Sequence, residues 1–360
     1  MGFSGSLSRR EVLRAAGAAG AAMCWPGAGS AATSRPAVPQ PIRGSWISIL
    51  WDDRRHLFWN EQCRDYSAEQ WAAAVRDVAE VGMEYLVLLA VAKGGEAFYD
   101  TPLLPKAKLA CADPIEAMLA EADACGVKFF MSSDWYAGWD EAAVADPERM
   151  KVRVRMMGEL AAKYSHHTSF HGWYWPNEAY LTPYFTEPFV KHINACSAEA
   201  HKLTPKARTL TAPYGTHKAV CDDRFIRQLD GLDVDIIAYQ DEVGCLRATP
   251  DEIARCYERL RQAHDKVPQR ALWADVEVFA WEGPPNKQSS PLIPAPFDRV
   301  ERQLEAASPF VDRILIYQYQ GLLSKPGSAA PAGPPQAEKL YRDYVAWLAV
   351  NHPGMLRRRA

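Results

Sequence analysis

Two glutamates in this sequence directly follow apolar runs that we predict to be β-strands. Glu178 comes shortly after the run that ends at Trp175, and Glu277 comes directly after the run that ends at Val276. Cleavage of a glycosidic bond needs one carboxylic acid to protonate the leaving oxygen and a second to attack the anomeric carbon or activate water. Asn177 could also donate a hydrogen bond to a sugar 2-hydroxyl group. The sequence therefore predicts Glu178 and Glu277 as the catalytic pair.

Three other carboxylates compete with Glu277 for this role. Asp241 and Glu242 follow another apolar run, and Asp275 lies two residues before Glu277, so it could share the same strand face. Asp241 or Asp275 could replace Glu277 as the partner of Glu178. Retaining enzymes hold the two groups about 5–5.5 Å apart and inverting enzymes about 6.5–9.5 Å apart. The sequence leaves the choice between retention and inversion open.

Aromatic residues are abundant, with 12 Trp, 15 Tyr and 12 Phe, and many stand at or beyond the predicted strand ends. Aromatic faces stack on the CH-rich faces of sugar rings, while carboxylates and amides bind hydroxyl groups. The alternative is that these rings only cap a hydrophobic core. We predict that the following residues bind substrate: Asp134, Trp135, Tyr136, Trp175, Asn177, Tyr214, Tyr239, Gln240, Asp241, Phe279 and Tyr319.

Eight short apolar runs alternate with amphipathic segments along the chain. Continuous apolar strands that alternate with helices predict a parallel sheet covered on both faces, and eight such units close a (β/α)8 TIM barrel. An open doubly wound sheet is the competing architecture, but the GxGxxG fingerprint of nucleotide binding is absent. The predicted strands are Gly44–Leu50, Tyr85–Val91, Val127–Ser132, Gly172–Trp175, Thr209–Ala212, Asp235–Tyr239, Leu272–Val276 and Arg313–Tyr317.

Helix starts are recognisable between these strands. Ser67 begins a capping box, and Asp113, Asp146 and Thr249 each precede a proline that suits the first helical position. Further helices are predicted near 187–203, 223–230, 297–307 and 335–350. Because catalytic groups of TIM barrels lie at the C-terminal ends of the strands, the residues named above occupy the expected face.

Three segments resemble a bacterial family labelled domain of unknown function 4434, which is grouped with the glycoside-hydrolase TIM barrels. They are Phe170–Glu178 (Phe-His-Gly-Trp-Tyr-Trp-Pro-Asn-Glu), Gly44-Ser-Trp-Ile and Tyr239-Gln-Asp. The resemblance covers roughly residues 43–350 and implies a sugar-active barrel within the wider clan of retaining (β/α)8 glycoside hydrolases. Trp175-Pro-Asn-Glu178 resembles the acid/base signature of that clan, which implies Glu178 as general acid/base, Glu277 as nucleophile and a retaining mechanism. That clan commonly carries a tryptophan at the end of strand eight, where this chain has Gln318-Tyr319-Gln320.

Other function classes are less well supported. The formal net charge of -3 and the lack of a long basic run argue against nucleic-acid binding. No metal or organic cofactor is expected, because His166, His167 and His171 precede the fourth strand and so lie at its wrong end for catalysis. The seven cysteines that remain after removal of a leader have no CxxC spacing and predict neither a disulfide framework nor a zinc cluster.

The N-terminus has the features of an export signal. Arg9 and Arg10 precede an Ala/Gly-rich apolar stretch that ends in small residues, as in a twin-arginine signal peptide. The stretch is too short and too rich in alanine for a membrane span, and Cys24 matches a lipid-attachment site poorly. We predict a signal peptide at 1–32, a Pro-rich lead-in at 33–42, a catalytic barrel at 43–350 and a basic tail at 351–360.

The sequence as a whole predicts a periplasmic or secreted glycoside hydrolase that acts on a poly- or oligosaccharide. The first alternative is a non-catalytic polysaccharide-binding barrel associated with exopolysaccharide machinery. A polysaccharide lyase or deacetylase would need a Lys/Tyr base or a metal triad at the barrel mouth, and the sequence shows neither clearly. The sugar, the linkage, endo or exo action and the oligomeric state are not determined by the sequence.

Overall fold

The structure is a computed structural model, and it describes most of the predicted barrel. The residues that it describes are 38–50, 61–133, 146–176, 181–284 and 290–356. Among these residues, the helices are all too short or too polar to cross a membrane.

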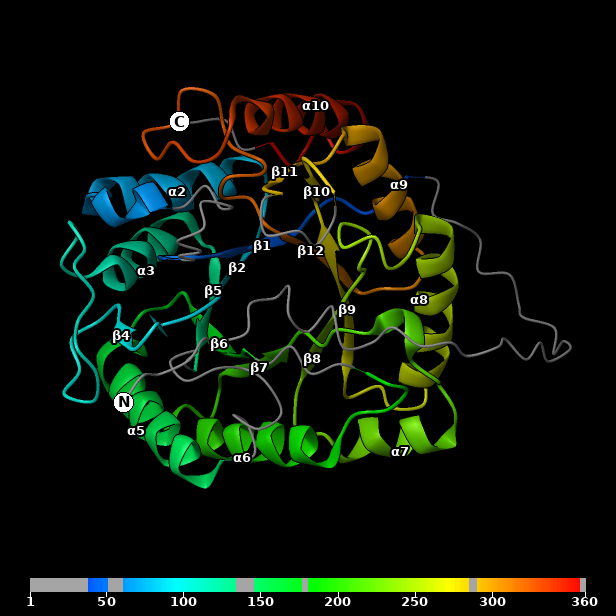
Figure 1. Ribbon diagram of the computed structural model, residues 1–360, viewed down its shortest axis with the longest axis horizontal. Coiled ribbons are helices and arrows are strands. Elements are labelled where there is room, and N and C mark those ends of the chain that lie inside the picture. Colours follow the sequence, from blue (N-terminus) through cyan, green and yellow to red (C-terminus); the bar gives the residue numbers. More distant parts are fainter. Residues whose placement is uncertain (1–37, 51–60, 134–145, 177–180, 285–289, 357–360) are drawn as a thin grey trace, which may run out of the picture.

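Eight parallel strands close into a barrel, as the sequence predicted, and the competing open sheet is wrong. Each strand pairs with two neighbours, and β1 pairs with both β2 and β12, so the sheet has no free edge (Figure 1). The strands in chain order are β1 (Gly44–Ile47), β2 (Tyr85–Leu88), β5 (Lys128–Ser132), β6 (Phe170–Trp175), β7 (Arg208–Thr211), β8 (Ile236–Gln240), β9 (Ala271–Glu277) and β12 (Arg313–Tyr317).

Helices surround the barrel and begin where the sequence predicted (Figure 1). Ser67 makes the predicted capping box, and Asp113 and Asp146 accept backbone hydrogen bonds in the first turns of their helices. The helices are α2 (Ala68–Glu80), α3 (Pro114–Cys125), α5 (Pro147–Tyr164), α6 (Glu187–Leu203), α7 (Asp223–Gly231), α8 (Pro250–His264), α9 (Phe297–Ala307) and α10 (Pro335–Asn351), with short 3-10 turns η1 (Glu61–Asp65) and η2 (Thr216–Lys218).

Two small hairpins extend from the connections of the barrel. The antiparallel pair β3 (Ala92–Lys93) and β4 (Glu96–Ala97) follows β2. The pair β10 (Phe279–Trp281) and β11 (Leu292–Pro294) begins two residues after Glu277, so it stands at the C-terminal end of β9.

Large aromatic rings fill part of the interior of the barrel. Tyr85 lies 4.9 Å from Trp273, and His171 lies 5.9 Å from Tyr85 and 5.2 Å from Phe130, measured between ring centroids. These four residues come from four different strands, so they meet on the barrel axis. Burial lowers the pKa of His171 to about 4, which leaves a neutral packing residue.

A bulge in β6 changes the direction of the side chains that follow it. Phe129 pairs with Phe170 and Phe130 pairs with Gly172, so His171 is an extra residue in the ladder. Because side chains alternate between the two faces of a strand, one extra residue reverses the face of every later residue of β6.

Candidate active site

Glu277 is the last residue of β9, and the structure places it among the C-terminal ends of the strands. It pairs in register with Tyr317 of β12. Trp273 of the same strand points to the barrel axis, so strand alternation directs Asp275 and Glu277 to the same side. Glu277 therefore occupies the face and the end of the barrel at which catalytic groups of this fold lie.

The segment from Asp241 to Arg247, which follows β8, wraps around Glu277; we call it the 241–247 clasp. The backbone N–H of Cys245 donates to Glu277 Oε2 over 2.7 Å, and the Cys245 thiol donates to Oε1 over 3.2 Å. The N–H of Glu277 donates to Asp241 Oδ1 over 3.1 Å. Both ends of Glu277, its carboxylate and its backbone, are thus fixed by the clasp.

The clasp has a demanding backbone geometry. A Cβ atom on Gly244 would lie 2.9 Å from Glu277 Cβ and 2.8 Å from the carbonyl oxygen of Phe279, so only glycine fits there. Glu242 and Leu246 have φ angles of 56° and 58°, a left-handed conformation that costs free energy for residues with a side chain. Such strain persists only where surrounding contacts enforce it, and it often marks functional sites.

Helix α9 supports the clasp and β9 from behind. Arg299 Nη2 donates to the carbonyl oxygens of Glu277 and Phe279 over 2.8 and 2.7 Å. Gln303 Nε2 donates to Asp241 Oδ2 over 2.6 Å and to the Glu277 carbonyl over 3.1 Å. Burial lowers the pKa of Arg299, while the nearby charges of Asp241 and Glu277 oppose this change. The helix therefore satisfies the buried polar backbone at the end of β9.

Asp241 was predicted to bind substrate, and the structure corrects this prediction. Its Oδ1 accepts from the backbone N–H groups of Val243 and Glu277, and its Oδ2 accepts from Gln303. The side chain is buried and directed to Gln303 of α9, because Asp241 directly follows β8 and lies on the same side of the chain as Tyr239. Asp241 thus holds the clasp and Glu277 in place, and its oxygens are engaged within the protein.

We expect the stability of the Asp241→Asn variant to depend less on pH than that of the wild type. Burial raises the pKa of Asp241 to about 6, whereas an unfolded aspartate titrates near about 3.9. The folded protein binds the extra proton between these values, so the free energy of unfolding falls as the pH rises from about 4 to about 6. The loss is on the order of 3 kcal/mol.

Urea unfolding at pH 4.5 and pH 7.5 measures this dependence. The control is Asp298→Asn, which changes an exposed aspartate on the same helix α9 that carries Gln303. The free energies of unfolding of wild type and Asp241→Asn should differ by different amounts at the two pH values. An equal difference at both would contradict the assignment of the pH dependence to the Asp241 carboxyl group.

Two of the predicted aromatic residues lie beside Glu277. The Phe279 ring contacts the Tyr317 ring at 6.3 Å, and its backbone packs on Gly244 of the clasp. Tyr214, after β7, lies under the Arg247 guanidinium at 5.5 Å. Burial raises the pKa of Tyr214, and the charges of Cys245, Glu242 and Glu277 raise it further. The Tyr214 phenol therefore lies close enough to Glu277 to interact with its charge.

Three other predicted platform rings face away from the barrel axis. The Tyr239 hydroxyl lies 3.1 Å from His264 Nε2 of α8. Trp175 stacks on Trp173 at 6.2 Å with an interplanar angle of 11°. Tyr319 lies 6.3 Å from Tyr341 of α10. All three are buried, so the prediction that they form a sugar platform is wrong. Strand alternation directs Trp175 and Tyr239 to the helices, whereas Tyr319 lies two residues beyond the end of β12 and packs against α10.

The outward direction of Trp175 follows from its neighbour. The indole nitrogen of Trp173 donates to the Thr204 hydroxyl at the end of α6 over 2.8 Å, and Trp175 shares that face of β6. Gln240, predicted to contact a sugar hydroxyl, is buried and donates through Nε2 to the Ala212 carbonyl over 3.1 Å. That contact joins the ends of β7 and β8.

Two residues near the C-terminal ends of the strands, Tyr317 and His217, were not predicted from the sequence. Tyr317 pairs with Glu277 and contacts Phe279, and it is the last residue of the apolar run Arg313–Tyr317, whereas Tyr319 lies beyond the strand. His217 Nδ1 lies 2.7 Å from Glu242 Oε2, and Glu242 is fully buried. The pair lies on the connections that follow β7 and β8.

Five predicted site residues lie outside the described residues. They are Asp134, Trp135, Tyr136, Asn177 and Glu178. The pairing of Glu178 with Glu277 as catalytic carboxylates, and the retention that a short distance between them would give, therefore stay predictions.

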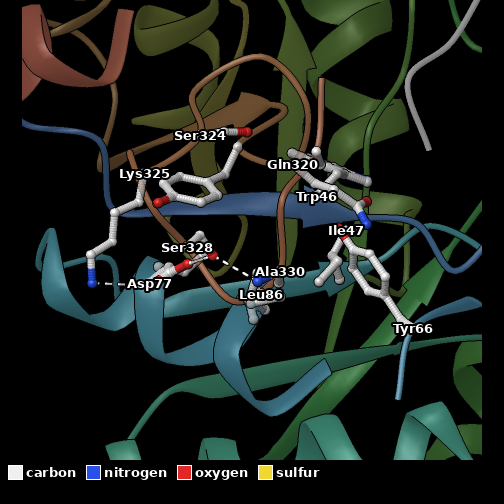
Figure 2. Close-up of a pocket in the computed structure, with 14 residues that line it drawn as sticks. Trp46, Ile47, Tyr66, Asp77, Leu86, Gln320, Ser324, Lys325, Ser328 and Ala330 are labelled. Atoms are coloured by element: carbon white, nitrogen blue, oxygen red, sulfur yellow. Dashed lines mark hydrogen bonds and ion pairs between the residues drawn. The ribbon is translucent and has the colours of Figure 1, made fainter. Parts of the chain in front are cut away.

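A small cavity lies away from Glu277, between β1, α2 and the connection from β12 to α10. Its volume is about 20 Å³, close to that of one water molecule. Figure 2 shows Lys325, Asp77 and Ser328 at its edge. Lys325 Nζ lies 3.2 Å from Asp77 Oδ1, and the Ser328 hydroxyl donates to Asp77. These contacts hold the segment between β12 and α10 against α2.

Comparison with protein families gives one match. The family described as "Domain of unknown function (DUF4434)" matches residues 42–330. A search of curated proteins gives no significant match.

Several solved structures with a similar fold are glycoside hydrolases or candidates for that activity. A candidate alpha-L-fucosidase from Bacteroides thetaiotaomicron has a TM-score of 0.68 and 18% identity, over 93% of this chain and 98% of that chain. An endo-beta-1,4-mannanase from Thermotoga petrophila has a TM-score of 0.55 and 8% identity, over 91% and 80%. A beta-galactosidase from Marinomonas ef1 has a TM-score of 0.53 and 13% identity, over 86% and 59%. These likenesses concern the fold.

Proposed function

This chain belongs to the family described as Domain of unknown function (DUF4434), and on that premise we propose that it is a glycoside hydrolase. Its substrate is a bacterial or environmental poly- or oligosaccharide, and two carboxylates perform the reaction. Glu277 is the nucleophile and Glu178 the general acid/base. The similarity of the barrel to those of glycoside hydrolases supports the reaction class.

The observation that carries the proposal is the fixed carboxylate of Glu277 at the C-terminal end of β9. A nucleophile works when its reacting atom is held in one position, because orientation removes part of the entropic barrier. Cys245 fixes the carboxylate and Asp241 fixes the backbone of Glu277. The neighbouring Tyr214, Phe279 and Tyr317 supply ring surface beside it.

The proposed reaction has two steps. Glu178 donates its proton to the glycosidic oxygen while Glu277 attacks the anomeric carbon, so the glycosidic C–O bond breaks and the alcohol leaves. Glu178, now a carboxylate, then takes a proton from water, which attacks the same carbon and releases Glu277. The net result is hydrolysis with retention of the anomeric configuration.

A non-catalytic polysaccharide-binding barrel is the second candidate function. One observation favours it: Glu277 is 0% exposed, and each of its carboxylate oxygens contacts Cys245. If the Glu277 carboxylate stays buried when a sugar binds in the barrel, it holds the clasp together without reacting.

A screen of purified protein against bacterial exopolysaccharides and oligosaccharides tests the two functions. For a hydrolase we expect new reducing ends and shorter products by mass spectrometry, and NMR of the first product formed should show the retained anomer. Binding of a polysaccharide without any product after prolonged incubation would overturn the hydrolase proposal and support the second function.

The N-terminal segment completes the proposal. We assign residues 1–32 to a twin-arginine-type export signal, residues 33–42 to a lead-in, residues 43–350 to the catalytic barrel and residues 351–360 to a basic tail, which makes the mature protein periplasmic or secreted. N-terminal sequencing of the exported protein should find the new N-terminus near residue 33. An intact N-terminus in the exported fraction would contradict cleavage.

A further inference from the structure

Three side chains with metal-binding donors meet at the end of the barrel opposite to Glu277. Glu116 lies in the first turn of α3, and His166 and His167 lie in the turn between α5 and β6. One donor atom from each residue lies within 4.8 Å of the other two. Among the described residues, this is the one group of three His, Cys, Asp or Glu side chains with that spacing.

His167 is held in a fixed orientation. Its Nδ1 lies 2.7 Å from Asp123 Oδ2, so the ring donates that proton to the carboxylate. Asp123 is itself fixed, because its Oδ1 accepts from the Thr168 hydroxyl and the Ser169 backbone N–H over 2.9 and 2.6 Å. A histidine that donates one ring N–H to a carboxylate and presents its other nitrogen is the usual arrangement of a metal ligand.

The presented nitrogen faces a carboxylate at a suitable distance. His167 Nε2 lies 3.2 Å from Glu116 Oε2. With Nδ1 bonded to Asp123, both atoms are acceptors, so a proton or a cation must stand between them. A tetrahedral Zn²⁺ with bonds of about 2.0–2.1 Å places its ligand atoms about 3.3 Å apart.

His166 can supply the third donor. Its ring is exposed and lies 4.2 Å from the His167 ring between centroids, so a side-chain rotation moves its nitrogen toward the other two atoms. Two imidazoles and a carboxylate suit Zn²⁺ and similar divalent transition metals better than Mg²⁺ or Ca²⁺, which prefer oxygen. The carboxylates of Glu116 and Asp123 also balance the charge of a divalent cation.

We propose that Glu116, His166 and His167 form a binding site for one divalent transition-metal ion such as Zn²⁺. Water completes the tetrahedron. The ion joins the start of α3 to the turn before β6 and so stabilises the fold. It has no part in the hydrolysis proposed above, because His167 precedes β6 whereas Glu277 ends β9, and the two ends of parallel strands lie on opposite faces of the barrel.

The test is zinc binding by the untagged full-length protein after treatment with EDTA. Isothermal titration calorimetry with ZnCl₂ should show one ion per chain, and the melting temperature should rise with zinc concentration. His166 is exposed and the Glu116 side chain is 45% exposed, so His166→Ala and Glu116→Gln should both fold. Each should raise the dissociation constant for zinc by about tenfold or more. Millimolar Mg²⁺ should not compete.

The matched control is His201→Ala. This exposed histidine lies 4.0 Å from Asp233 and belongs to no group of three donors among the described residues. It should leave zinc affinity unchanged. The proposal is overturned if the wild type binds no zinc at about 100 μM free ion, if His166→Ala and Glu116→Gln both bind as tightly as the wild type, or if His201→Ala abolishes binding. Each of these readouts is independent of catalysis.

Discussion

Glu277→Gln should lower turnover by at least about 10⁴-fold while the protein stays folded. An amide is a poor nucleophile, so the covalent step cannot proceed, and loss of a nucleophile in enzymes of this type of chemistry costs this much or more. The fold should survive because the amide oxygen can still accept the Cys245 N–H and the NH₂ group can face the sulfur. Initial rates and a thermal melt measure the two effects.

The controls for Glu277 are other acids of the same barrel. Glu305→Gln changes an exposed residue of α9 and should leave turnover unchanged. Asp275→Asn and Asp241→Asn test the two rival carboxylates, which we expect to retain measurable turnover because neither is assigned to attack the sugar. Full activity of Glu277→Gln, or a loss confined to one of the rivals, would move the nucleophile to another residue.

Glu178→Gln should slow hydrolysis by about 10²–10⁴-fold, and the size of the loss should depend on the leaving group. A sugar alcohol needs a proton as it leaves, so natural substrates should show the full loss. A dinitrophenolate needs none, so the first step on a dinitrophenyl glycoside should proceed at nearly the wild-type rate. The second step lacks its base, and a burst of dinitrophenol should therefore precede slow turnover.

Pre-steady-state absorbance measurements with both substrate types provide the check for Glu178. Azide, a nucleophile that needs no base, should restore turnover of the variant and yield a glycosyl azide. An equal loss on both substrates, with no burst and no azide effect, would assign Glu178 a role in binding or folding and leave the acid/base unidentified.

The barrel could be predicted from the sequence because its signals are local. Each of the eight strands is a short apolar run, and helix starts such as Ser67 and Thr249 carry their own capping side chains. Continuous apolar strands between helices are buried on both faces, which requires a parallel sheet. The structure agrees with all eight predicted strands and with the helices between them.

The position of Glu277 could be predicted for a similar reason, but its surroundings could not. A carboxylate directly after an apolar run stands at the end of a strand, so its end of the barrel follows from the sequence. The clasp contacts of Cys245 and Gly244 join residues more than 30 positions apart in the chain, and the φ angles of Glu242 and Leu246 are enforced by those contacts. No local sequence pattern predicts these contacts or these φ angles.

The sequence by itself determined the elements of this protein, their order and the strand ends at which Glu277, Tyr214 and Phe279 lie. Only the tertiary structure decided which side chains turn to the barrel axis, because alternation along a strand gives relative directions and not the absolute one. The bulge at His171 shows the physical reason: one extra residue in β6, set by pairing with β5, sends Trp175 to the helices.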